Sequence, residues 1–79
     1  MNPRVKSVKP LPGCKLAIQF NNGESGVFNC QPMLSIPVYE ILKNPAYFNE
    51  ASVEYGTVVW PNDLDICPDT LYLDSIKSI

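Results

Sequence analysis

The sequence predicts an α+β fold in which a small, mostly antiparallel sheet of about five strands carries two or three short helices on one face. Three observations support this class. Apolar residues recur with period two up to Cys30, the spacing then approaches 3.6 residues, and β-branched and aromatic residues return after residue 51. With 79 residues and 8.8 kDa there is room for one core, so we expect residues 1–79 to form a single domain.

The first expected strand contains Val5 and Val8 separated by basic residues, and prolines interrupt its end at Pro10 and Pro12. Proline has no N–H to donate to a neighbouring strand. This strand is therefore expected either to lie at an edge of the sheet or to stop at Pro10.

A β-hairpin is expected next, because apolar and polar residues alternate strictly before an Asn-Gly pair at 22–23. The alternating apolar residues are Leu16, Ile18 and Phe20, and the return strand covers 24–30. Two registers remain open. A two-residue turn sets Ile18 opposite Val27, whereas a three-residue loop with a glycine bulge sets Leu16 opposite Phe28.

Two short helices are expected in the middle of the chain. Pro37 suits the first position of a helix whose apolar face is formed by Val38, Ile41 and Leu42. Asn44-Pro45 ends this helix and can open a second one, with Asn44 as cap and with Tyr47 and Phe48 to bury. Helices this short are stable only when they pack on other elements, so both should lean on the sheet.

Strands return after residue 51. Gly56 marks a tight turn or a bulge before the strand 57–60, and 61–63 supplies turn residues after which 64–67 can pair back. Pro68-Asp69 begins a last turn, and Leu71, Tyr72 and Ile76 then lie in a short C-terminal helix or tail. We expect one core to contain Phe20, Phe28, Trp60 and Leu71.

Charge bears on the class of partner. The net charge of −2 and the pI near 4.8 argue against broad binding to a phosphate backbone, which requires clustered cations. Four of the six basic residues nevertheless lie in the first fifteen positions. They form a candidate basic edge: Arg4, Lys6, Lys9 and Lys15. We expect this edge to be a solvated strand rather than a nucleic-acid site.

Cysteine usage indicates a reducing compartment. Cys14, Cys30 and Cys67 are odd in number, show no C-x-x-C spacing and have no histidine to complete a zinc site. Their apolar neighbours predict buried or half-buried thiols, without metal, disulfide or other cofactor. No apolar run is long enough for a signal peptide or a membrane span, so a cytoplasmic location without a membrane partner is expected.

Catalytic motifs are missing from the sequence. Without histidine, Ser-His and Cys-His nucleophile systems are excluded, and no glycine-rich phosphate loop occurs. The spacing of Asp63, Asp65, Asp69 and Asp74 imitates a calcium loop, but Pro68 occupies the position that needs glycine. Carboxylates beside a turn are expected to be solvated, which does not suit acid–base catalysis. We therefore expect no catalytic, cofactor-binding or metal-binding residues.

The densest segment is "WPNDLDICPDTLY", residues 60–72. Its structural interpretation is a pair of corners in which Asn62 and Asp63 accept backbone hydrogen bonds and Asp69 caps or acidifies the first turn of the last helix. Its functional interpretation is a surface for a partner protein. The candidate residues of that surface are Trp60, Asn62, Asp63, Asp65 and Asp69. We favour the corner and keep the partner surface as the alternative.

The order of motifs resembles a bacterial and phage family known as domain of unknown function 2442. The resemblance rests on "RVKSVKPLPGCKLAIQFNNGES", "VFNCQPML", "NPAYF" and above all "GTVVWPNDLDICPDTLY", and it extends from Arg4 to Tyr72. The last segment matches the family signature W-P-N-x-x-D-[LI]-x-P-[DE]-[TS]-L-Y. Met33 and Asp63 depart from the family, which more often has an aliphatic residue and a glycine there.

The resemblance implies a small α+β domain, found alone or joined to a helix-turn-helix segment, whose gene often neighbours that of another small protein, as in toxin–antitoxin pairs. It supplies no catalytic residues. We therefore expect a non-enzymatic interaction module that neutralises a small protein partner. One alternative is a DNA-associated regulatory accessory that uses the basic edge, although the 79 residues leave no room for an appended helix-turn-helix. The other alternative is a small enzyme.

Overall fold

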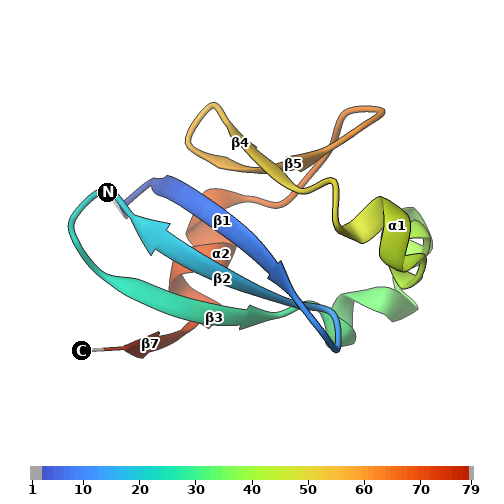
Figure 1. Cartoon of the computed structure of the whole chain (residues 1–79), viewed down its shortest axis with the longest axis horizontal. Helices are drawn as coiled ribbons and strands as arrows, with labels where there is room; N and C mark the ends of the chain where they lie inside the picture. The colour runs from blue at the N-terminus through green and yellow to red at the C-terminus, as the bar shows by residue number, and fades with distance from the viewer. Residues whose placement is uncertain (1–2, 79) are drawn as a thin grey trace.

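The computed structural model describes residues 3–78 and contains two antiparallel sheets (Figure 1). The first has the strand order β1-β2-β3-β7, with bounds Val5–Leu11, Lys15–Phe20, Ser25–Asn29 and Ile76–Ser78. The second has the order β4-β5-β6, with bounds Ser52–Glu54, Thr57–Trp60 and Leu64–Asp65. The α+β class and the antiparallel pairing are confirmed, but the single sheet of about five strands is wrong. Tight local turns connect β4, β5 and β6, so they pair with one another and form a separate meander.

The strand β1 lies at an edge of its sheet, as expected. It does not stop at Pro10, which lies opposite Leu16, but runs on to Leu11. An edge strand has one side without a neighbouring strand, so the missing proline N–H costs no ladder hydrogen bond there. The pairing with β2 shifts between Val5 and Ser7, which marks a bulge near the start of the strand.

The register of the β2–β3 hairpin is the one with the three-residue loop. Leu16 lies opposite Phe28, and the N–H of Phe20 donates to the carbonyl oxygen of Glu24 at 2.8 Å. Gly23 takes the positive φ of 90° that this loop requires, a conformation that glycine adopts without steric cost. In this register Leu16, Ile18 and Phe20 lie on the buried face of the sheet, where each is at most 1% exposed.

The strand β7 was not predicted, since the sequence suggested a helix or tail for this segment. It pairs antiparallel with β3, with Val27 opposite Ile76. A Cβ atom on Gly26 would lie 2.9 Å from the carbonyl oxygen of Ile76 and 3.1 Å from Cβ of Ser75. Glycine at this position therefore permits the close approach of β7.

The segment after β3 forms two 3-10 helices, η1 (Gln31–Ser35) and η2 (Pro37–Lys43), in place of the expected α-helix. The predicted apolar face is wrong in part: Leu42 is fully buried, but Val38 and Ile41 are 60% and 47% exposed. A 3-10 helix has three residues per turn, so Val38 and Ile41 share one face while Leu42 lies on another. Prolines at 32, 37 and 45 keep each helical segment short.

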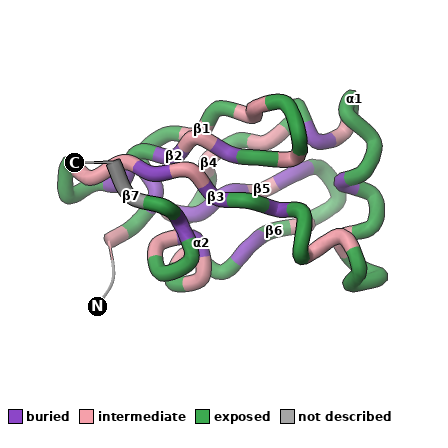
Figure 2. The backbone as a smooth tube through the Cα atoms, turned by 90° about the horizontal axis from the view of Figure 1, so that it is seen from below, coloured by how far each residue is buried: buried purple, intermediate pink, exposed green. Residues whose placement is uncertain are grey.

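Two α-helices complete the fold. In α1 (Pro45–Phe48) Asn44 is the expected cap, since its Oδ1 accepts from the N–H of Ala46 at 3.0 Å, and Phe48 is buried. The helix α2 (Pro68–Asp74) confirms the short C-terminal helix. Figures 1 and 2 show α2 against one face of the four-stranded sheet, whereas the segment that ends with α1 lies at the end of the sheets.

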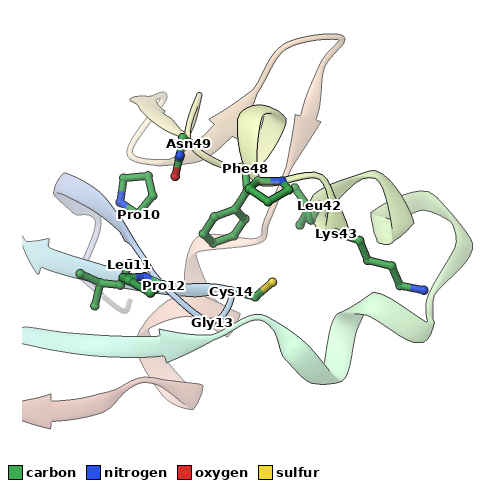
Figure 3. A pocket seen from close by; sticks show the side chains of 10 residues that line it. Pro10, Leu11, Pro12, Gly13, Cys14, Leu42, Lys43, Phe48 and Asn49 are labelled. Carbon is green, nitrogen blue, oxygen red and sulfur yellow. The ribbon is translucent and has the colours of Figure 1, made fainter.

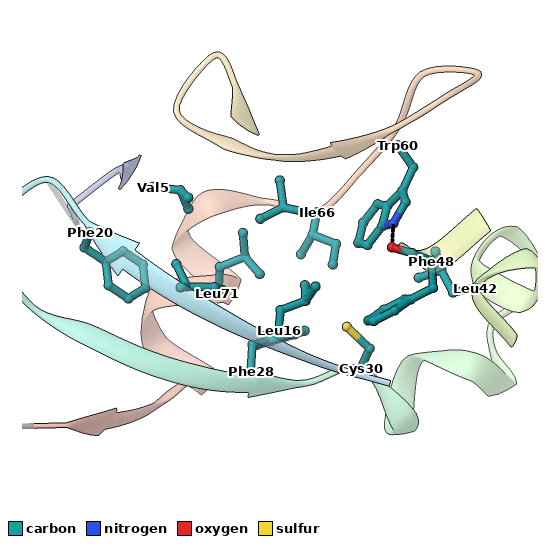
Figure 4. Packing of buried hydrophobic residues seen from close by; sticks show 12 residues of the cluster. Val5, Leu16, Phe20, Phe28, Cys30, Leu42, Phe48, Trp60, Ile66 and Leu71 are labelled. Atoms are coloured by element: carbon teal, nitrogen blue, oxygen red, sulfur yellow. Dashed lines mark hydrogen bonds between the residues drawn. The ribbon is translucent and has the colours of Figure 1, made fainter. Parts of the chain in front are cut away.

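The core lies between the two sheets and α2 (Figure 4). The four side chains expected to share it, Phe20, Phe28, Trp60 and Leu71, all belong to one buried cluster, which confirms that prediction. The indole N–H of Trp60 donates to the carbonyl oxygen of Phe48 at 3.0 Å, so the polar atom of this buried ring is satisfied. Figure 2 shows buried residues in strands of both sheets and in α2.

Candidate functional site

The residues predicted as a partner surface do not all reach the surface. Trp60 is 3% exposed and is a core residue, so it offers no contact area and its assignment to a surface is wrong. The other four, Asn62, Asp63, Asp65 and Asp69, are exposed. A tryptophan followed by proline has the same appearance in sequence whether its ring points inward or outward. Only the packing of the folded chain decides which way the ring points.

The corner at 61–63 has a different physical basis from the one predicted. Asn62 and Asp63 take positive φ angles of 69° and 62°, and within residues 3–78 neither side chain accepts a backbone hydrogen bond. Asparagine and aspartate tolerate this left-handed conformation better than most residues. The turn is also held from outside, because the hydroxyl of Tyr47 donates to the carbonyl oxygen of Pro61. The corner is confirmed, whereas its predicted side-chain hydrogen bonds are not observed.

The two remaining acidic candidates lie on either side of the start of α2. Asp69 is in the first turn of this helix, as predicted, where a negative charge is favourable. Asp65 is exposed on β6, and its backbone carbonyl accepts from the hydroxyl of Tyr39 at 2.8 Å. Within residues 3–78 no three His, Cys, Asp or Glu side chains come close enough to hold a metal ion.

The basic edge is divided by the fold. The strand pairing places Lys9 opposite Ala17 and Lys15 opposite Leu11, so both lysines lie on the outer face of the four-stranded sheet. Lys6 lies at the bulge of β1. Arg4 packs near the β4–β5 turn, where its Cβ is 3.0 Å from the position of a Cβ built on Gly56. All four are exposed, but only two of them are shown to share a face.

The cysteines are all free thiols in different environments. Cys30 is buried and Cys14 is half-buried, as expected, but Cys67 is exposed, and its predicted burial is wrong. Cys67 immediately precedes Pro68, and its apolar neighbour Ile66 turns inward while Cys67 turns outward. Burial, followed by the charge of Cys14, raises the pKa of the Cys30 thiol to about 12, so Cys30 is not a nucleophile at neutral pH.

One hollow of about 280 Å³ lies between the β1–β2 turn and α1 (Figure 3). Prolines and apolar side chains dominate its lining. Cys14 and Lys43 are its chemically distinctive groups, and Figure 3 shows the Lys43 side chain extending away from the others. Among the described residues no carboxylate lines this hollow, so it offers no carboxylate pair for acid–base chemistry.

A larger cleft of about 480 Å³ lies between the η1–η2 segment and α2. We refer to it as the acidic cleft. Its lining residues are Phe28, Asn29, Pro32, Met33, Ile36, Tyr39, Ile66, Cys67, Thr70 and Asp74. Phe28 and Ile66 are buried core residues, whereas Ile36 is 45% exposed and Asp74 is exposed. The cleft therefore has an apolar base, a partly apolar rim and one carboxylate.

Tyr39 links the two sides of the acidic cleft. Its hydroxyl donates to the backbone carbonyl of Asp65, which holds η2 against the end of β6, just before α2. Burial raises the pKa of this phenol, and the nearby charges of Asp65 and Cys67 raise it further. Asp65 therefore adds negative potential beside the cleft, and among the side chains that the structure describes no lysine or arginine lines it. This negative environment gives the cleft its name.

The η1–η2 segment carries three exposed aliphatic side chains, here called the aliphatic patch, which the helical interpretation of the sequence missed. It consists of Ile36, Val38 and Ile41, which are 45%, 60% and 47% exposed. The closely spaced prolines were the available signal, because they favour 3-10 turns with a period of three. With a period of three, Val38 and Ile41 share one face. Met33, Ile36 and Tyr39 share another face, and these three residues line the cleft.

The comparisons with known proteins add a family but no activity. A family model described as protein of unknown function, DUF2442, matches residues 5–77. Neither the curated proteins nor the solved structures that were searched include a match to this chain. Within residues 3–78, no helix combines the length and apolar character needed to cross a membrane.

Proposed function

Because this chain belongs to the DUF2442 family, whose function is unknown, we propose that it is a non-enzymatic protein-interaction module. Its proposed role is to neutralise a small protein partner in a toxin–antitoxin-like pair. The gene arrangement implied by the family resemblance supports a paired partner, and the acidic composition supports a basic one.

The observation that carries the proposal is the aliphatic patch. Ile36, Val38 and Ile41 expose about half of their side chains although the core beside them is well filled. Clustered aliphatic groups on a small soluble domain have an unfavourable contact with water that a bound partner removes. The proline-limited 3-10 segment that presents them is supported by Leu42 and Tyr39, so the patch is held in place before binding.

Co-expression with the protein of the neighbouring gene tests this proposal. We expect a stoichiometric complex on size-exclusion chromatography and restored growth if the neighbour is toxic. Val38→Asp should weaken the complex, because a charge at the contact must be desolvated. Tyr55→Asp is the matched control, since Tyr55 is 94% exposed on the distant β4–β5 turn and aspartate tolerates its φ of 54°. No complex and no rescue would contradict the proposal.

A second candidate role is association with DNA through the basic edge. It is favoured by the placement of Lys9 and Lys15 on one exposed sheet face. If Arg4 and Lys6 also contact phosphates, the logarithm of the binding constant should fall with the logarithm of salt concentration with a slope of roughly −2 to −4. A gel-shift titration in which Lys9→Glu and Lys15→Glu leave binding unchanged would contradict this role.

A further inference from the structure

The acidic cleft has the features of a site for a protein segment rather than for a small molecule. Its volume of about 480 Å³ lies within the range of ligand pockets, but the polar groups that fix a small ligand are few. The Tyr39 hydroxyl, the natural candidate for such a role, is already engaged by the carbonyl of Asp65. Val38 and Ile41 on the same proline-limited segment are also exposed, although they do not line the cleft.

Charge determines the class of segment that fits. Asp74 lines the cleft, and Asp65 lies close enough to Tyr39 to raise the pKa of its phenol. The basic side chains that the structure describes lie elsewhere: Arg4, Lys6, Lys9 and Lys15 precede or belong to β1 and β2, and Lys43 lines the other hollow. The sixth basic residue, Lys77, belongs to β7. A segment with an apolar side chain next to a lysine or arginine is therefore complementary to the cleft, whereas an acidic segment is repelled.

We propose, on the basis of the interaction role above, that the acidic cleft binds a basic segment of a partner protein. One aliphatic or aromatic side chain of the segment enters between Met33, Ile36 and Tyr39, and an adjacent lysine or arginine pairs with Asp74. The apolar contact supplies most of the affinity, and the charge pair selects basic over acidic segments. Binding leaves the core hydrogen bonds of the domain in place.

Synthetic peptides test this assignment without a known partner. The probe is a short fluorescein-labelled peptide of leucines flanked by lysines, and its counterpart carries glutamates in place of the lysines. We expect the lysine peptide to bind with a Kd on the order of 10–100 µM and the glutamate peptide to bind at least tenfold more weakly. Equal binding of the two peptides would overturn the charge assignment.

Two pairs of variants locate the binding site. Asp74→Lys should raise the Kd of the lysine peptide by about tenfold or more. Glu54→Lys, an equal change of charge on the exposed strand β4, should change this Kd by less than about threefold. Ile36→Asn should abolish binding because it removes the apolar contact without adding charge, while Leu73→Asn should not, because Leu73 is 66% exposed on α2 and does not line the cleft. Equal effects within either pair would overturn the proposal.

The thiols provide an independent footprint on the unaltered chain. Cys67 is exposed and lines the acidic cleft, whereas Cys14 lines the other hollow. The bound lysine peptide should slow alkylation of Cys67 several-fold and leave Cys14 unaffected. Unchanged alkylation of Cys67 at saturating peptide would place the peptide elsewhere and overturn the assignment, as would a dimer in which a second copy fills the cleft.

Failure of this assignment is distinguishable from failure of the interaction role. If the neighbouring protein forms its complex but Asp74→Lys and Ile36→Asn leave that complex intact, only the cleft assignment is refuted. If no partner complex forms but the lysine peptide binds as described, the interaction role fails while the chemical preference of the cleft stands.

Discussion

Phe28→Ala tests the packing that places the acidic cleft beside the core. Phe28 is 3% exposed, lies opposite Leu16 in the β2–β3 register and contributes its ring to both the core and the cleft. Removing the ring loses its transfer free energy and leaves a cavity, because Leu16 is itself fully buried and fixed in the ladder. For a buried phenylalanine this loss amounts to about 3–5 kcal/mol of unfolding free energy.

That loss is comparable with the whole stability of the domain. At roughly 0.05–0.15 kcal/mol per residue, a domain of this length has an unfolding free energy of about 4–12 kcal/mol. Each kcal/mol corresponds to roughly 4–8 °C in Tm for a domain of this size, so Phe28→Ala should lower Tm by at least about 12 °C. At the lower end of the stability range the variant should be largely unfolded at 25 °C.

Thermal and urea unfolding, followed by circular dichroism and by the fluorescence of Trp60, measure this effect. Val38→Ala is the matched control, since Val38 is 60% exposed and its truncation should change the unfolding free energy by no more than about 0.5 kcal/mol. A Phe28→Ala variant that melts within two or three degrees of the parent would refute the β2–β3 register and the shared core.

Three further predictions follow from particular backbone and side-chain positions. Gly26→Ala should detach β7, because the added Cβ would lie 2.9 Å from the carbonyl oxygen of Ile76, and faster amide exchange at Val27 and Lys77 would report it. Asn62→Ala should lower the unfolding free energy by about 1 kcal/mol, while Asn62→Gly should not, because the φ of 69° is strained for alanine; equal melts would contradict this. Burial raises the pKa of the Cys30 thiol from 9.0 to about 12, so between these pH values only the unfolded state releases the proton. The unfolding free energy should therefore fall as pH rises from about 9 to about 12. Urea unfolding at a series of pH values measures this fall.

Local signals in the sequence predicted local structure well. The Asn-Gly pair at 22–23, the Asn44 cap and the turn at 61–63 each depend on a few neighbouring residues, and the structure contains all three features. The shared core was also predictable, because burial of large apolar side chains does not require knowledge of the exact strand order. The family follows from the same local motifs, since its model matches residues 5–77.

Features that depend on contacts between distant segments were not predictable in this way. The separation into two sheets and the pairing of β7 with β3 each depend on which surfaces meet in three dimensions. Periodicity assigns a residue to a face of its own element but does not identify the element that covers that face. The expectation that Cys67 would be buried was wrong for a related reason: it was inferred from an apolar neighbour in sequence, and that neighbour faces the opposite way.

The candidate site shows most clearly which features follow from the sequence and which depend on the tertiary structure. The sequence by itself determined that the chain has no histidine for nucleophile systems, that its charge is acidic and that prolines interrupt the segment after Cys30. Only the tertiary structure decided that this segment forms 3-10 turns, that Val38 and Ile41 face outward and that Asp74 joins Met33 at one cleft. The physical reason is that a cleft is formed by residues far apart in the chain, and the free energy that brings them together comes from burial of the core between them.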